Sequence, residues 1–207
     1  MRLSEKTLEL NICAQINERT SRRHIWFGLT QKQEAKAGFD ACARFNGRLI
    51  IFQFKASNYT LSNGLRRFYG SHDQMQNLIN RCHGYFRSVF YVFPLVGNTL
   101  ELHREGGDVV SSTWLMDVAI LRNPLPLPTI RNSRNIRKNH VHYIDVVPGQ
   151  AIIHSEPFQS ELIKIQDYFS EGSNGSDGLN YLFQEDFESF YKFCKTLDPH
   201  SKGLILI

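Results

Sequence analysis

Cysteine is scarce in this sequence, long apolar runs are missing, and neither sign of charge dominates. The four cysteines are Cys13, Cys42, Cys82 and Cys194, and their wide spacing indicates neither a zinc knuckle nor a small disulfide framework. No stretch approaches the roughly 20 apolar residues that cross a bilayer, and the opening MRLSEKTLEL lacks the apolar segment of a signal peptide. We therefore expect a protein of the reducing cytoplasm with no membrane partner.

The composition is that of an ordinary globular protein. The chain has 207 residues, of which 42% are hydrophobic and 21% charged, enough to form one sizeable core. A formal net charge of +4 permits a polyanionic partner but does not require one.

Hydrophobic periodicity predicts the secondary structure of the first half. Residues 3–18 form a helix that Ser4 can cap, and residues 71–85 form a second helix. Strands are expected at 24–29, 38–45, 48–55 and 88–94, with polar connections at 30–36 and 56–70. The resulting order is α-β-β-β-α-β.

The second half is less regular. Strands are predicted at 100–103 and 140–147, whereas 114–121 fits either a strand or a helix. The segment 122–130 is a proline-rich connection. Amphipathic helices are predicted at 156–169 and 179–197, and the aromatic residues of the second belong to the core.

A tight turn fixes the register of the two central strands. Asn46-Gly47 between alternating hydrophobic residues predicts a two-residue β-hairpin turn. Phe45 then opposes Arg48, and at each further step the numbers of the two paired residues again sum to 93. Asp40 therefore opposes Gln53, and Lys55 lies on the same face because side chains alternate along a strand.

This hairpin has one apolar face and one polar face. Phe39, Ala41, Ala43, Ile50, Phe52 and Phe54 pack on the core. The face with Asp40, Gln53 and Lys55 is then exposed or occupied. The carboxylate of Asp40, the amide oxygen of Gln53 and the backbone carbonyl of Phe54 are hard ligands that suit Mg²⁺ or Mn²⁺. Lys55 can position or help deprotonate a bound water; the alternative is a solvated hairpin face.

The residues Gly38-Phe39-Asp40 and Gln53-Phe54-Lys55 resemble the signature of the PD-(D/E)XK nuclease superfamily, in particular its Mrr-like restriction endonucleases. The resemblance implies an α/β, restriction-endonuclease-like core with a mixed sheet at 1–95, and a C-terminal elaboration at 96–207 packed on it in one compact domain. It also implies Mg²⁺-dependent hydrolysis of DNA, or of RNA, in a restriction or antiviral role. Asp40 and Gln53 would be metal ligands, and Lys55 would assist the nucleophilic water.

Members of the superfamily often add an acidic residue from the first helix. Glu9 is the preferred candidate and Glu5 the alternative, because Glu9 flanks the apolar stripe of the helix. Two features depart from the family pattern: Gly-Phe precedes Asp40 where the family has proline, and Gln53 carries no charge.

Other polar residues are candidates for substrate contact. Basic side chains that suit phosphate binding are Arg66, Arg67, Arg131, Arg134, Arg137 and Lys138. A solvated loop explains the last four equally well. His72 and Gln74 are auxiliary candidates at the start of the second helix, although His72 also suits a simple helix start. Glu34 is a lesser candidate that we expect on the surface.

Two further functions stay open. The chain can be an inactive nuclease fold that binds nucleic acid or senses a ligand, which the uncharged Gln53 permits. It can also be a structural protein whose C-terminal aromatic helices bind a partner, as a homo-oligomer or with another subunit of a defence system.

Overall fold

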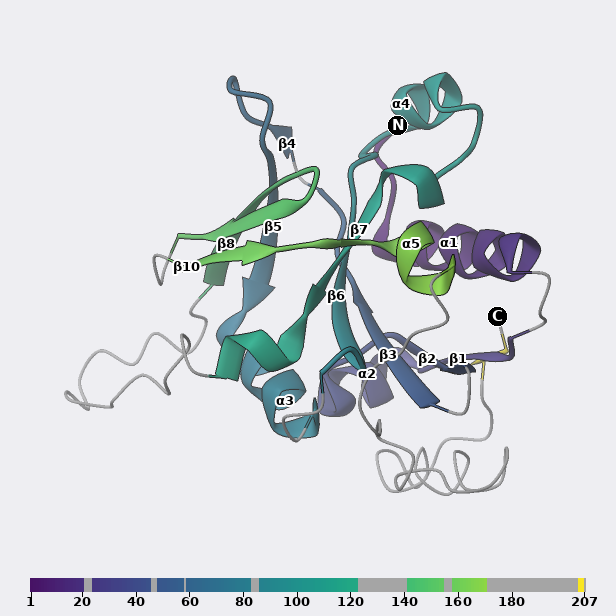
Figure 1. The fold of residues 1–207 in the computed structure, drawn as a ribbon, viewed down its shortest axis with the longest axis vertical. Helices are drawn as coiled ribbons and strands as arrows, with labels where there is room; N and C mark the ends of the chain where they lie inside the picture. The colour runs from purple at the N-terminus through teal and green to yellow at the C-terminus, as the bar shows by residue number, and fades with distance from the viewer. Residues whose placement is uncertain are drawn as a thin grey trace.

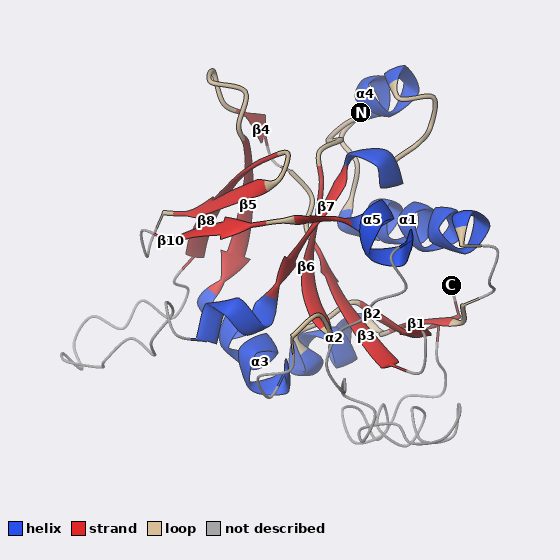
Figure 2. Cartoon of the chain, viewed as in Figure 1, coloured by secondary structure: helices blue, strands red, loops and turns tan. Residues whose placement is uncertain are grey.

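The computed structural model of the chain describes residues 1–20, 24–45, 48–57, 59–82, 86–122, 141–154, 158–170 and 205–206 (Figure 1). These residues form an α/β fold with a mixed sheet, a second, antiparallel sheet, and helices that cover both faces of the mixed sheet (Figure 2). None of the helices in these ranges is long and apolar enough to cross a membrane.

The mixed sheet contains the predicted hairpin at its centre. Its strand order is β11-β7-β6-β3-β2-β1-β12. The strands are β1 Trp26–Gly28, β2 Ala41–Phe45, β3 Arg48–Phe54, β6 Val89–Pro94, β7 Thr113–Asp117, β11 Ile163–Lys164 and β12 Ile205–Leu206. β3 and β6 are parallel, and the other neighbours are antiparallel.

The second sheet is antiparallel, with strand order β10-β9-β8-β5-β4. Its strands are β4 Tyr59–Thr60, β5 Arg66–Ser71, β8 Val141–Val147, β9 Gln150–Ile153 and β10 Phe158–Glu161. Each sheet therefore contains strands from the segment 1–95, which we expected to form the core, and strands from the segment 96–207.

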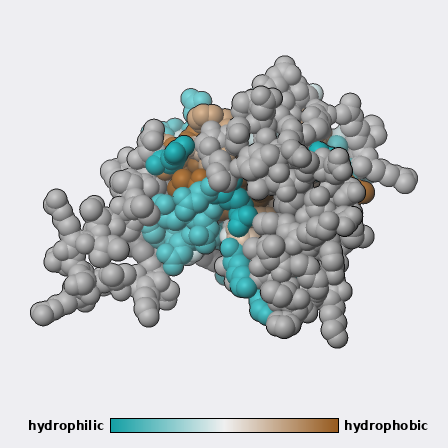
Figure 3. Space-filling model, turned by 90° about the horizontal axis from the view of Figure 1, so that it is seen from below, coloured by the Kyte–Doolittle hydropathy of each residue, from teal (hydrophilic) through white to brown (hydrophobic). Residues whose placement is uncertain are grey.

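Five α-helices and two 3₁₀ turns complete the described chain. They are α1 Glu5–Arg19, α2 Gln31–Ala37, α3 His72–Cys82, α4 Thr99–Arg104, α5 Ile165–Ser170, η1 Val110–Ser112 and η2 Val118–Arg122. Toward α2 and α3 the described surface is mostly hydrophilic, with a smaller apolar area beside it (Figure 3).

Two apolar layers enclose the mixed sheet. On one face, Phe52 and Phe90 pack with Ile12 of α1 and Tyr168 of α5. The cluster on the other face joins Cys42, Ile51 and Tyr91 to Met75 and Leu78 of α3 and to Phe68 of β5. Burial of these side chains is the main favourable term in folding, so the central strands are covered on both sides.

Several predicted elements are confirmed. α1 begins where the Ser4 hydroxyl accepts the backbone N–H of Thr7 at 3.0 Å. The hairpin register holds from the Phe45–Arg48 pair to the Ala41–Phe52 pair, although Asn46 and Gly47 lie outside the described residues. α3, β6 and β8 also lie where helix and strands were predicted.

Two short helices contradict the predicted pattern. Residues 30–36 are not a plain connection, because Gln33 Oε1 accepts the Thr30 N–H at 3.0 Å and starts α2. Residues 100–103 are helical rather than extended, because the Asn98 side chain accepts the Glu101 N–H at 2.9 Å and caps α4. α4 buries none of its side chains, so it gives no helical periodicity in the sequence.

The predictions at 156–169 and 56–70 were also wrong. Only Ile165–Ser170 of the expected helix is helical, since Phe158–Glu161 pairs with β9 and Ile163–Lys164 pairs with β7. The polar segment 56–70 contains β4 and most of β5. β5 pairs with β8, about 70 residues later in the chain, and this partner is invisible to local reasoning. The helix predicted at 179–197 lies outside the described residues. The segment 114–121 is β7 followed by η2.

Candidate functional site

A glycine-ended helix places Asp40 at the start of the hairpin. α2 ends at Gly38, whose φ of +79° lies in the left-handed region that favours glycine. A Cβ atom there would approach Cβ of Asn77 in α3 to 3.1 Å. The Asp40 N–H then donates to Phe52 O at 3.0 Å, one residue out of the hairpin register, whose last pair is Ala41–Phe52. This geometry explains why a glycine stands two residues before Asp40 in this chain.

Asp40 and Gln53 lie just beyond the last pair of the hairpin ladder and meet through their side chains. Gln53 Nε2 donates to Asp40 Oδ2 at 2.7 Å, and the Phe54 N–H donates to the same oxygen at 2.6 Å. Gln53 Nε2 also donates to the Phe54 carbonyl at 3.1 Å. The three candidate oxygen ligands, Asp40, Gln53 and Phe54, are therefore gathered at one end of β3.

Lys55 completes the cluster together with Glu5. The Lys55 ammonium lies 3.7 Å from Glu5 Oε1, and the same oxygen accepts the Ala56 N–H at 3.3 Å. Lys55 also lies close enough to Asp40 to lower the pKa of that carboxyl. Of the two acidic candidates on α1, the structure thus places Glu5, not Glu9, in contact with Lys55.

Glu9 belongs to a neighbouring ion cluster. Lys6 Nζ lies 2.9 and 2.8 Å from the two carboxylate oxygens of Glu9 and 3.5 Å from Glu34 Oε1. Glu34, which we expected on the surface, is half-buried and faces this cluster. Burial raises the pKa of Glu9 and of Glu34, while Lys6 acts in the opposite direction on both.

The polar face of the hairpin, which we expected to be exposed or occupied, is buried. Asp40, Gln53 and Lys55 are 8%, 1% and 7% exposed. Farther along the hairpin the same face buries Cys42 and Ile51 against α3 and the second sheet. The expectation of an exposed polar face was wrong there because the covering elements come from distant parts of the chain.

Burial controls the charge of Asp40. Loss of hydration raises the pKa of this carboxyl from 3.8 to about 7, against the lowering by Lys55 and by the Phe54 N–H. Glu5 and Glu34 raise it further. In the metal-free protein Asp40 is therefore protonated in a large fraction of molecules near neutral pH.

This pKa predicts how stability depends on pH. Because the folded chain holds the Asp40 proton more tightly than the unfolded chain, the contribution of Asp40 is complete below about pH 4 and is lost as pH rises through about 7. Asp40→Asn cannot ionise. In chelator we expect it to exceed the wild type in unfolding free energy by up to about 4 kcal/mol above pH 7, at 1.36 kcal/mol per pKa unit.

Urea unfolding at pH 4 and pH 8 in chelator measures this effect. The gain of Asp40→Asn should be present at pH 8 and nearly absent at pH 4. An equal difference at both pH values would show that Asp40 ionises normally in the folded protein.

Two buried polar atoms mark the same location. Gln53 Oε1 and the Tyr91 hydroxyl are buried and have no hydrogen-bond partner among the residues that the structure describes. Tyr91 pairs with Gln53 across β3 and β6, and burial, Asp40 and Glu5 all raise the pKa of its hydroxyl. A buried oxygen without a partner is costly, and a cation at Gln53 Oε1 would remove that cost. Carboxylate, amide and carbonyl oxygens are the ligand types of Mg²⁺ or Mn²⁺, but here the Gln53 amide presents Nε2, not Oε1, to Asp40 and Phe54, so an ion bound by all three groups would require the amide to be flipped.

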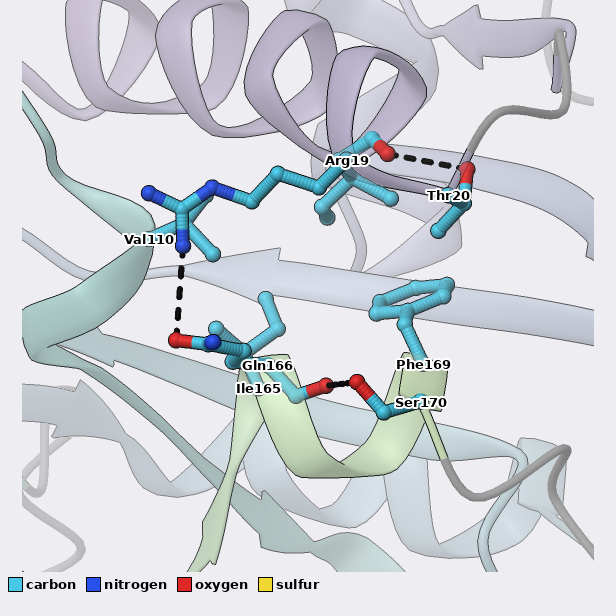
Figure 4. A pocket seen from close by; sticks show the side chains of 8 residues that line it. Arg19, Thr20, Val110, Ile165, Gln166, Phe169 and Ser170 are labelled. Atoms are coloured by element: carbon cyan, nitrogen blue, oxygen red, sulfur yellow. Dashed lines mark hydrogen bonds between the residues drawn. The ribbon is translucent and has the colours of Figure 1, made fainter.

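A groove lies next to the site, although Asp40, Gln53 and Lys55 do not line it. A hollow of about 400 Å³ is lined by Arg2, Leu3, Ser4, Glu5, Ala56 and Tyr69, so it adjoins Lys55 through Glu5 and Ala56. A larger cavity of about 520 Å³ lies at the other end of α1, between Arg19, Val110 and α5 (Figure 4). That cavity contains none of the candidate site residues, and Arg19 crosses it to bond Gln166 at 3.4 Å.

The other candidates take different positions. Arg67 forms a bidentate pair with Asp145, with both distances 2.6 Å, and Arg66 is ion-paired with Glu101. His72 Nδ1 lies 2.9 Å from Nε2 of the buried His142 in β8, rather than at Asp40. The backbone N–H of Gln74 donates to Ser71 at 3.2 Å in the first turn of α3. Arg131, Arg134, Arg137 and Lys138 lie outside the described residues.

Sequence reasoning missed Lys6 and Tyr91. Lys6 carried a usable signal, since a lysine three residues before Glu9 on a helix can pair with it. Tyr91 carried none, because it sits in an uninterrupted apolar run and reaches Gln53 only through the parallel pairing of β3 with β6.

Comparison of the chain with protein-family models, with curated proteins and with solved structures found no match. The resemblance to the PD-(D/E)XK superfamily therefore rests on the motif residues of the sequence alone.

Proposed function

We propose that this chain is a metal-dependent nuclease that hydrolyses phosphodiester bonds of DNA at the site formed by Asp40, Gln53 and Lys55. The observation that carries the proposal is that the buried Asp40 carboxylate bonds the Gln53 amide, whose oxygen has no partner among the described residues, with Lys55 close by and a hollow next to it. The order of elements predicted from the sequence was α-β-β-β-α-β. The observed order differs from it because α2, β4 and β5 are inserted.

The residues have distinct proposed roles. Asp40, Gln53 and the Phe54 carbonyl would hold Mg²⁺, which supplies charge stabilisation at the phosphate and acidifies a bound water. Lys55 would orient the nucleophilic water through its ammonium and help to deprotonate it. Glu5 contacts Lys55 and holds the ammonium in place, and as a wall of the groove it faces the entering substrate.

The ionisation of Asp40 favours catalysis at neutral to alkaline pH. A carboxyl with a pKa of about 7 must lose its proton to bind a cation, so metal loading should improve as pH rises through this value. The biological role that we propose, restriction or antiviral defence in the cytoplasm, follows from the Mrr-like resemblance of the motif.

The deciding experiment uses Asp40→Asn, which keeps the size of the side chain and an oxygen that can accept the Phe54 N–H. Purified wild type and variant are incubated with plasmid DNA, linear DNA and RNA in Mg²⁺, Mn²⁺ or chelator. We expect the wild type to cut DNA only with a divalent ion, and we expect the variant to be folded and inactive.

Other outcomes would point elsewhere. Binding of DNA without cleavage under any condition would favour a non-catalytic sensing module. Cleavage of RNA alone would change the substrate but keep the site. No interaction with either nucleic acid would overturn the proposal and favour a partner-binding protein.

A further inference from the structure

Beside the proposed metal site, the ammonium of Lys6 lies between the carboxylates of Glu9 and Glu34. The Lys6 ammonium contacts both oxygens of Glu9 at 2.8 and 2.9 Å and reaches Glu34 at 3.5 Å. Lys6 and Glu9 are three residues apart on α1, so the ammonium is attached to the same helix face as the carboxylate that it neutralises.

We propose that Lys6 serves as a built-in cation that fills the Glu9–Glu34 position, so that the site binds one divalent ion, at Asp40 and Gln53, and excludes a second. This inference rests on the proposed function, because it concerns the metal stoichiometry of that same site. Lys6 is thus a positioning residue that keeps Glu9 and Glu34 from becoming metal ligands.

The contacts explain why Glu9 is unavailable to a metal. Its side chain is only 3% exposed, and both of its oxygens already bond the Lys6 ammonium. A divalent ion would have to displace a cation that cannot diffuse away. Among the residues that the structure describes, no three acidic, histidine or cysteine side chains are grouped to hold a metal. Asp40 therefore does not share an ion with Glu9 and Glu34 in this arrangement.

Charge keeps the ammonium in place. Burial lowers the pKa of Lys6, but Glu9, Glu34 and Asp40 together raise it above its ordinary value. Lys6 consequently stays charged throughout the pH range of an enzyme assay. Without that charge, two neighbouring carboxylates would be left unneutralised, and a divalent cation would balance them.

Removal of the charge should create a second ion site. A single charge 4–6 Å away changes an ionisation equilibrium by about 1–3 pKa units, so we expect Lys6→Met to strengthen Mn²⁺ binding at Glu9 and Glu34 by at least about tenfold. Lys6→Arg keeps the charge and should behave like the wild type. Lys36→Met removes a charge from the exposed surface of α2 and serves as the matched control.

The experiment is a Mn²⁺ titration followed by electron paramagnetic resonance, which counts bound ions without any need for activity. The expected result is one Mn²⁺ per chain for wild type, Lys6→Arg and Lys36→Met, and two for Lys6→Met. Circular dichroism reports whether Lys6→Met folds; if it does not, two ions bound by the wild type or by Lys6→Arg would still overturn the inference.

The failures are distinguishable. Two ions in a wild type that cleaves DNA would overturn this inference and leave the proposed function intact. A folded Lys6→Met that binds one ion would do the same. No Mn²⁺ bound by the wild type would overturn the proposed metal site itself.

Discussion

Replacement of Lys55 by methionine is expected to lower the rate of DNA cleavage by roughly 10²–10⁴-fold, the usual contribution of a residue that assists proton transfer. Methionine preserves most of the aliphatic stem in this buried position but removes the ammonium that lies 3.7 Å from Glu5 and near Asp40. Because Lys55 supplies no oxygen ligand, binding of the divalent ion should persist. The effect should therefore appear in the cleavage rate rather than in the metal requirement.

Single-turnover cleavage with saturating protein measures the chemical step, and Mn²⁺ titration of the same variant measures ion binding. Glu5→Gln is the matched comparison, since it perturbs the partner of Lys55 without removing the ammonium. We expect it to be the milder variant, because the Glu5 carboxylate is half-exposed and partly solvated. Full activity of Lys55→Met would remove Lys55 from the mechanism.

Phe52→Ala is expected to lower the free energy of unfolding by about 3–5 kcal/mol, the range for a fully buried phenylalanine in a packed core. Phe52 is 0% exposed and lies on β3 directly before Gln53. Its ring is surrounded by Trp26, Phe54, Phe90 and Phe169 at centroid distances of 5.3, 5.8, 6.1 and 6.3 Å. The lost ring would leave a cavity that these rigid neighbours fill poorly.

Urea unfolding followed by circular dichroism checks this prediction. Phe86→Ala removes the same ring from a position that is 54% exposed, and it should change stability by less than about 0.5 kcal/mol. A similar loss in both variants would mean that the aromatic layer between α1, α5 and the mixed sheet contributes little.

The two predictions concern opposite sides of one strand. β3 carries Phe52 into the layer under α1 and α5, and it carries Gln53 toward Tyr91 and Asp40. A rigid central strand holds its side chains in fixed positions, which a metal site requires. The packing of Phe52 therefore supports the geometry of Gln53 and Lys55 as well as the stability of the fold.

The sequence by itself determined the local features of this protein. Ser4 begins α1, and the spacing of apolar residues specifies α3 and β6. The hairpin register brings Asp40 close to Gln53, because a two-residue connection fixes the pairing of the strands as far as Ala41 and Phe52. Each of these features depends on interactions between residues close in the chain, so each leaves a pattern in the sequence.

The tertiary structure alone decided what surrounds the hairpin. The second sheet exists because β5 pairs with β8, and α3 together with this sheet buries the face that was expected to be wet. The approach of α1 determined that Glu5 reaches Lys55 and that Lys6 reaches Glu34. Strand pairing and helix packing between distant segments leave no periodic signal in either partner. Their outcome depends on the complementary surface that the other segment provides, and the burial that raises the pKa of Asp40 follows from it.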